Sequence, residues 1–203
     1  MVRAKRSKPT FIEEARQKQI QEIARDLFIR VGFNQASLSD IAEAADISKG
    51  VILYHYGSKS ELGKAVLEDI LNTYGSFLSA QLEKKSTARD KLLELPNAFA
   101  SYVQKNYESF LLYIDVLGSF GNLEEKKEYM SDTNQTQRAF LRRLIEDCKK
   151  EGCSFKLKSS ALADVIQATL DGLIGQYSVD PDRVDLSACA RVLRQFLNEA
   201  IKS

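Results

Sequence analysis

The sequence predicts an all-helical fold of about nine helices. Apolar residues recur at i, i+3 and i+4 along almost the whole chain, alternating β-branched runs are scarce, and 203 residues contain only three prolines. The composition, 44% hydrophobic and 28% charged, is typical of a globular chain with a sizeable core. No apolar run approaches the ~18 residues needed to span a bilayer, and no apolar segment follows the basic N-terminus. We therefore expect a cytoplasmic protein without a membrane partner.

The first two helices are predicted from their start signals. Thr10 and Glu13 have the spacing of a capping box, in which a hydroxyl and a carboxylate satisfy each other's backbone N–H groups. An apolar stripe follows and stops at Gly32, a residue that favours helix ends. Ser37 and Asp40 repeat the capping-box spacing and predict a second helix of about two turns.

A third short helix is predicted over residues 49–56, with Ser48 as its cap, and Ser58 with Glu61 opens a long helix over 58–84. Such short helices are not stable alone, so residues 1–57 are predicted to pack as one small domain. The remaining helices, which form a second domain over 58–203, are predicted at residues 88–105, 107–120, 123–150, 159–177 and 185–202.

The stretch SLSDIAEAADISKGVILYHYGSKSEL, Ser37 to Leu62, predicts a helix-turn-helix. Ala42 is small enough for a close helix crossing, and Ile47 and Ile52 supply its core. In this geometry the second helix presents its N-terminal residues to the DNA major groove, which explains why it is so short. Residues 1–30 contain eight basic against four acidic side chains, and a basic arm attracts phosphates.

This stretch resembles the DNA-binding segment of the TetR family of transcriptional regulators. The matching residues are Ile41, Ala42, Ala45, Ile47, Ser48, Gly50, His55, Tyr56, Ser58, Lys59, Glu61 and Leu62. The chain departs from the family pattern at the turn, where Asp46 replaces glycine, and Asp tolerates the left-handed conformation at a cost of roughly 1 kcal/mol. A second departure puts Leu53 where a phosphate-contacting tyrosine often stands; Tyr54 follows it.

The resemblance implies two sets of DNA contacts in a palindromic double-stranded operator. Phosphates would be contacted by Ser37, Ser39, Tyr54, His55 and Lys59. Base edges would be contacted by Ser48, Lys49, Gly50 and Val51. Lysine can donate to guanine O6 and N7, and valine can pack on a thymine methyl group. Tyr56 is expected to pack in the core instead.

The last two helices predict a homodimer. Their apolar stripes repeat at helical spacing, small residues at 161, 168, 172 and 175 permit a second buried face, and the resembled family pairs these helices between subunits. The residues expected at the interface are Leu162, Ile166, Leu170, Leu173, Leu193 and Phe196. A two-fold dimer would hold two recognition helices about 34–36 Å apart, in successive major grooves.

The middle of the chain is rich in aromatic residues, which as a rule pack in the core. The resemblance implies that some of them bind an unknown small-molecule effector, expected to be apolar or aromatic, that moves the long helix at 58–84. The candidates are Phe99, Tyr102, Tyr107, Phe110, Tyr113 and Phe140.

The favoured hypothesis is thus a dimeric repressor released from its operator by the effector. One alternative is a helical protein-interaction module, and another is a DNA-binding activator without a small-molecule signal. An enzyme is disfavoured because nucleotide-binding, zinc-protease and nucleophile-elbow motifs are missing from the sequence. Three cysteines and one histidine make no zinc set, so no metal or cofactor is expected; a redox pair of Cys148 and Cys153 is the alternative to reduced thiols.

Overall fold

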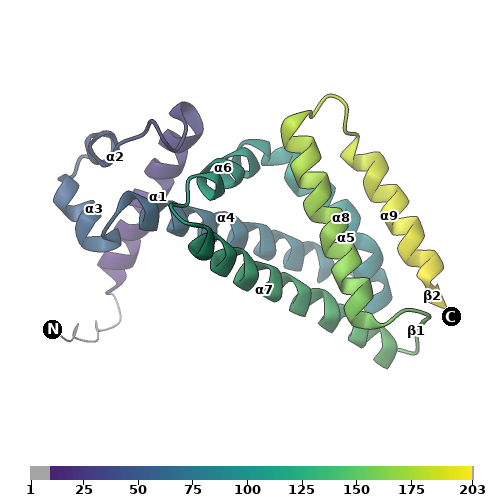
Figure 1. Ribbon diagram of the computed structural model, residues 1–203. Helices are drawn as coiled ribbons and strands as arrows, with labels where there is room; N and C mark the ends of the chain where they lie inside the picture. The colour runs from purple at the N-terminus through teal and green to yellow at the C-terminus, as the bar shows by residue number, and fades with distance from the viewer. Residues whose placement is uncertain (1–9, 203) are drawn as a thin grey trace. The chain divides into compact units, whose positions relative to one another are not determined.

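A computed structural model of the chain describes residues 10–202, and within them it contains nine α-helices and one pair of two-residue strands (Figure 1). The predicted all-helical class is confirmed. The elements are α1 (Phe11–Val31), α2 (Leu38–Ala44), α3 (Lys49–Tyr56), α4 (Lys59–Leu82), α5 (Ala88–Lys105), α6 (Tyr107–Gly118), α7 (Leu123–Lys150), β1 (Ser154–Phe155), α8 (Ser159–Val179), α9 (Leu186–Ala200) and β2 (Ile201–Lys202).

The chain divides into two compact units. Unit 1 runs to Ile70 and also includes Leu112–Phe120, whereas unit 2 comprises Leu71–Leu111 and the chain from Gly121 onward. The division therefore falls within α4 and α6, both of which contribute residues to each unit. The functional boundary between residues 57 and 58 stays a prediction.

Two capping boxes start the helices of unit 1, as the sequence predicts. At α1 the Thr10 hydroxyl accepts a hydrogen bond from the Glu13 amide (3.3 Å), and the Glu13 carboxylate accepts one from the Thr10 amide (2.7 Å). Ser37 and Asp40 form the same pair of bonds at α2, at 3.2 and 2.9 Å. Gly32 ends α1 with φ 84°, a left-handed conformation that suits glycine.

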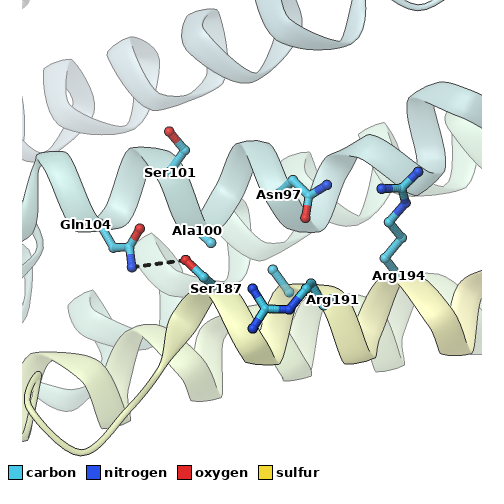
Figure 2. A pocket seen from close by; sticks show the side chains of 8 residues that line it. Asn97, Ala100, Ser101, Gln104, Ser187, Arg191 and Arg194 are labelled. Atoms are coloured by element: carbon cyan, nitrogen blue, oxygen red, sulfur yellow. Dashed lines mark hydrogen bonds between the residues drawn. The ribbon is translucent and has the colours of Figure 1, made fainter.

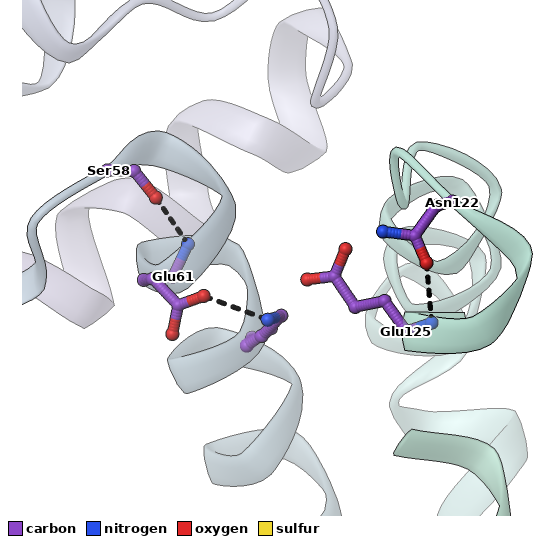
Figure 3. Close-up of polar contacts among 5 residues, drawn as sticks. Ser58, Glu61, Asn122 and Glu125 are labelled. Atoms are coloured by element: carbon purple, nitrogen blue, oxygen red, sulfur yellow. Dashed lines mark hydrogen bonds and ion pairs between the residues drawn. The ribbon is translucent and has the colours of Figure 1, made fainter. Parts of the chain in front are cut away.

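Side-chain caps also start two of the long helices (Figure 3). The Ser58 hydroxyl accepts a hydrogen bond from the Glu61 amide at 3.1 Å, and the Glu61 carboxylate pairs with Lys64 at 2.8 Å. The Asn122 side-chain oxygen accepts a hydrogen bond from the Glu125 amide at 2.7 Å. Each cap satisfies one of the backbone donors that a helix start leaves open.

The turn between α2 and α3 uses Asp46 in the left-handed conformation, at φ 52°. The following amide, that of Ile47, donates to the Ala42 carbonyl at 3.0 Å and closes the turn. Ser48 stands at the N-cap of α3 as predicted, but its side chain forms no capping hydrogen bond. The backbone of Ser48 is extended, as at other N-caps, but its hydroxyl accepts no hydrogen bond from the first amides of α3. Those amides are therefore not bonded to the Ser48 side chain.

Unit 2 is built around α5, which packs against α7 and α9, while α7 packs against α8. Its core contains fully buried Leu92, Phe99, Ile145 and Ile166. The helix α5 continues through Pro96, which is buried within it. Because α5 also contacts α8, ten of its 18 residues are buried.

The last helix is shorter than predicted. It ends at Ala200, and Ile201 and Lys202 pair as an antiparallel strand with Phe155 and Ser154. Ile201 is 7% exposed and falls four residues after buried Leu197, so its apolar character fits the helical period although its backbone is extended. Apolar spacing alone could not reveal this change of conformation.

Candidate nucleic-acid interface

The helix α3 rests on the core of unit 1 with one side and leaves the other side open. Ile52 of α3 is fully buried. On α2, Ile41 and Ala42 are buried, and so is the C-cap residue Ala45. This burial provides the support that an eight-residue helix requires.

The four residues predicted to contact bases lie together at the start of α3. Ser48, Lys49 and Gly50 are exposed, and Val51 is half-buried. A Cβ added at Gly50 would meet the Ser48 hydroxyl at 3.6 Å, an ordinary van der Waals distance, so the glycine leaves room for another surface to approach. The first turn of α3 can therefore present backbone amides and side chains to a groove.

Tyr54 points outward and its hydroxyl donates to the Glu13 carboxylate, at 3.4 Å. Hydrogen bonds from the Thr10 backbone and hydroxyl, then from Tyr54, lower the pKa of Glu13, and His55 lowers it further. The Tyr54 and His55 rings meet edge to face with their centroids 5.1 Å apart. Leu53 is 40% exposed and carries no polar group, which leaves Tyr54 as the phosphate-contact candidate.

Tyr56 ties α3 to α1. Its hydroxyl donates to the Gln17 carbonyl at 2.8 Å, and burial raises its pKa to about 12. The side chain is half-buried, so it packs between the helices as expected.

Lys59, the first residue of α4, already has partners within unit 1. Its ammonium donates to the Asn34 carbonyl at 3.1 Å and lies 4.6 Å from the centroid of the Phe33 ring. Burial lowers the pKa of Lys59, while the Asp115 charge raises it. An ammonium has three N–H donors, so Lys59 can contact a phosphate and keep its bond to Asn34.

Two serines lie at the start of α2, on an exposed surface. The Ser37 oxygen accepts from the Asp40 amide, yet its O–H can still donate to a phosphate oxygen. Ser39 is exposed on the first turn. The hydrogen bonds from Ser37 lower the pKa of Asp40, which keeps this carboxylate ionised in its capping role.

Three supporting roles were not predicted from the sequence. Glu13 orients Tyr54, and Asp115 on α6 accepts a hydrogen bond from the Phe33 amide at 2.7 Å. At Gly63 an added Cβ would lie 2.7 Å from the Phe33 ring and 3.3 Å from Val116, so only glycine permits this approach. The sequence did offer a signal for the close contact at Gly63, namely a glycine in the middle of a predicted helix. The contact of Asp115 with Phe33 joins residues 82 positions apart, and no sequence pattern indicated it.

The aromatic residues predicted to bind an effector separate into different environments. Tyr102 and Phe110 are buried together, with ring centroids 6.0 Å apart, and Tyr74 packs on both. Phe99 is 1% exposed among core side chains, and Tyr107 donates to the Ser178 carbonyl at 3.2 Å.

The other two candidates differ from these in their unit or their exposure. Tyr113 belongs to unit 1, and Phe140 is 38% exposed on α7. The cluster in unit 2 contains Tyr102 and Phe110, in direct ring contact, with Tyr74 and Phe77, which were not among the candidates. Which of the six candidates bind an effector stays a prediction.

Most residues predicted at the dimer interface are buried within one protomer. Four of the six residues are at most 8% exposed inside a single protomer, because the main apolar stripe of each helix builds the protomer's own core: Leu162, Ile166, Leu170 and Leu193. Leu173 also packs against that core, whereas Phe196 is 61% exposed. An interface would have to use the other, exposed faces of α8 and α9.

Comparison with known proteins identifies the DNA-binding segment. A family model described as "Bacterial regulatory proteins, tetR family" matches residues 20–66, which contain α2, α3 and their supports. The chain belongs to the TetR family. This TetR-family protein is 25% identical over 181 residues to the helix-turn-helix transcriptional regulator TtgR of Pseudomonas putida, covering 86% of each chain.

Solved structures share the fold of this TetR-family protein. FadR from Bacillus subtilis in complex with stearoyl-CoA aligns with a TM-score of 0.73 at 18% identity, covering 91% of this chain and 99% of that one. A transcriptional regulator from Saccharomonospora viridis in complex with choline also gives 0.73, at 19% identity and 93% and 98% coverage.

The family assignment makes the chain a DNA-binding transcriptional regulator and not an enzyme. None of the helices within residues 10–202 is both long and apolar enough to cross a membrane.

Proposed function

We propose that this TetR-family regulator is a homodimeric repressor that binds a palindromic operator and leaves it when a small-molecule effector binds. The observation that carries the proposal is the start of α3, where exposed Ser48, Lys49 and Gly50 stand on a helix anchored by buried Ile52. An exposed, rigidly supported helix start is what base readout in a major groove requires.

The DNA contacts fall into two roles. Ser48, Lys49, Gly50 and Val51 would face base edges, where each well-made contact discriminates by about 1–3 kcal/mol. Phosphates would be contacted by Ser37, Ser39, Tyr54, His55 and Lys59. Tyr54 is well placed for this role because its 3.4 Å bond to Glu13 is long for an O–H donor, so a phosphate oxygen can replace the carboxylate.

The proposed dimer uses a second strip on each of the last two helices. On α8 the exposed residues Ala161, Val165, Ala168 and Gly172 recur at helical spacing, and a Cβ added at Gly172 would meet no atom within 4 Å. On α9 the strip contains Val192 and Phe196, 49% and 61% exposed. Small residues beside large apolar ones allow two helix pairs to pack closely across a two-fold axis.

The proposed effector site lies in unit 2, beside the ring cluster of Tyr74, Tyr102 and Phe110. Gln167, 6% exposed, donates to the Asp171 carboxylate at 2.8 Å, and desolvation raises the pKa of Asp171 although Gln167 and Arg138 oppose it. Proteins of this fold have been solved with ligands as different as stearoyl-CoA and choline, so the fold does not select the effector.

These side chains favour an effector with an apolar or aromatic body and one hydrogen-bond donor directed at Asp171. Its binding must stabilise a shape with lower operator affinity, and operator binding must weaken the effector equally. The helices α4 and α6 are the candidates for coupling, because both contribute residues to each unit and α6 carries the Asp115 bond to Phe33.

The test is selection from a random duplex library by the purified protein at two salt concentrations, followed by sequencing of the bound DNA. A palindrome should be enriched, and its affinity should fall steeply with salt because phosphate contacts release counterions. The absence of enrichment at both salts would support the protein-interaction alternative instead. Placing the selected operator within or upstream of a reporter promoter then separates repression from activation.

Two variants test the assigned roles on the selected operator. Lys49→Ala should relax the preference at one symmetric pair of positions by about 1–3 kcal/mol. Tyr54→Phe should instead weaken specific and random DNA alike, because a phosphate contact carries no base information. If Tyr54→Phe changed the preferred sequence, its phosphate role would be wrong.

The dimer is tested by sedimentation of a Val165→Glu, Phe196→Glu double variant, which should be monomeric with poor operator affinity. Leu123→Glu, at an apolar residue that is 65% exposed outside the proposed strips, is the matched control and should remain dimeric. A dimer that survived the double substitution would place the interface elsewhere.

A further inference from the structure

A polar groove between α5 and α9 takes no part in the DNA, dimer or effector sites proposed above. It has a volume of about 370 Å³, and its lining includes Asn97 and Gln104 from α5 and Ser187, Arg191 and Arg194 from α9 (Figure 2). Both helices belong to unit 2, and they pack directly against each other.

Hydrogen bonds join the two helices on either side of the groove along their length. The Gln104 amide donates to the Ser187 hydroxyl at 3.4 Å, and the Arg89 guanidinium donates to the Asn198 side-chain oxygen at 2.6 Å. These bonds hold α5 and α9 together at positions 15 residues apart on α5 and 11 apart on α9, so the groove between them has fixed walls.

Small side chains make the space between those bonds. Ala100 of α5 and Ala190 of α9 line the groove and are 3% and 2% exposed, so they form its floor. The Asn97 carboxamide extends from α5 above α9, between the two arginines in the view of Figure 2. The floor is apolar, whereas the walls carry N–H donors.

The two arginines supply an uncompensated positive charge. Arg191 and Arg194 are three residues apart, which puts them on the same flank of α9. In the described chain, residues 10–202, no carboxylate forms an ion pair with either of them. Each guanidinium therefore keeps its planar fork of donors available for an anion.

The groove lies on a different flank of α9 from the proposed dimer strip. Ser187, Arg191, Arg194 and Asn198 recur at intervals of four, three and four residues, the spacing of one helix face. Val192 and Phe196 fall on the opposite side of the core-facing stripe. Because the two flanks differ, a dimer formed through the apolar strip leaves the arginines accessible.

We propose that this groove binds a small organic anion with two anionic groups, phosphate or carboxylate. Arg191 and Arg194 each bind one group through paired N–H donors, and the Asn97 amide donates to the oxygens between them. The volume suits a small molecule. This site is separate from the aromatic cluster proposed for the effector.

The test is an NMR titration of the full-length protein, following the side-chain amide signals of Asn97 and Gln104. Pyrophosphate is the phosphate probe and citrate is the carboxylate probe, each added at constant ionic strength with chloride as the balancing anion. The expected result is a saturable shift of the Asn97 signal with at least one of them. The probe with the higher affinity identifies the anionic group that the site prefers.

Variants separate this site from general attraction of anions to a basic surface. R191A/R194A should weaken binding at least about tenfold, since charge-assisted hydrogen bonds are lost at exposed positions that leave the core intact. R191K/R194K keeps the charge but not the forks and should weaken binding severalfold. Arg183→Ala removes one exposed arginine of a surface turn and should leave the affinity unchanged.

Two results would overturn the proposal. One is a titration in which R191A/R194A binds both probes as tightly as the wild-type protein. The other is a titration in which neither probe shifts the Asn97 signal. Because the signals followed are local to α5, failure of operator selection would not affect the outcome, and failure here would leave the DNA proposal untouched.

Discussion

The helices α3 and α5 are stabilised in opposite ways. Ten of the 18 residues of α5 are buried, among them Phe99, so apolar packing determines its position. Only Ile52 is fully buried in the eight residues of α3, and a hydrogen bond from Tyr56 to Gln17 ties it to α1. A helix that must present its surface to a partner cannot bury that surface, so burial at one point and a polar tether hold it instead.

The largest expected effect tests the packing half of this comparison. Phe99→Ala should lower the free energy of unfolding by about 3–5 kcal/mol, because it leaves a cavity around a side chain that is 1% exposed. Phe140→Ala, at a position 38% exposed, is the control and should cost under about 1 kcal/mol. Urea denaturation measures both. Equal losses would mean that Phe99 does not belong to the core of unit 2.

A smaller effect is expected where Gly63 of α4 closely approaches Phe33. Gly63→Ala should destabilise the protein by about 1–3 kcal/mol, since its Cβ would overlap the Phe33 ring at 2.7 Å and press on Val116 at 3.3 Å. Gly75→Ala, on the same helix α4, meets no atom within 4 Å and should stabilise it by about 0.5–1 kcal/mol. Thermal unfolding should therefore shift in opposite directions; shifts of the same sign would contradict the contact.

The smallest expected effect tests the polar tether. Tyr56→Phe should cost about 0.5–1.5 kcal/mol near pH 7 through loss of the bond to Gln17. Burial raises the folded-state pKa of Tyr56 to about 12, above an unfolded value of ~10, so this tyrosine's contribution is complete below pH 10 and is lost between pH 10 and 12. The variant should lose less stability across that window.

Tyr74 also contributes to the loss of stability at alkaline pH. Burial also raises the pKa of Tyr74, so the variant should keep part of the alkaline destabilisation rather than lose all of it. Denaturant midpoints at pH 9, 10 and 11 measure the difference. Identical slopes for the two proteins would show that Tyr56 ionises as freely in the folded state as in the unfolded chain.

Local signals predicted most helix starts and ends, but not their full geometry. Thr10 and Ser37 form the expected capping boxes because the partners lie three residues away in the same chain segment. Ser48 has the residue type and backbone of a cap but forms no side-chain bond. At Ile201 the apolar period continued while the backbone became extended. In both cases the residue type allowed two conformations.

The sequence by itself determined the helical class, the helix-turn-helix and the family, because capping, turn geometry and apolar period are encoded within a few residues of each other. Tertiary structure decided which apolar stripe each helix uses for its own core, and so left exposed Val165 and Phe196 for the proposed dimer strip. It also decided contacts such as Asp115 with Phe33, and the groove beside Arg191, since these join residues far apart in the chain. Long-range contacts depend on how whole helices pack, and no local pattern specifies that packing.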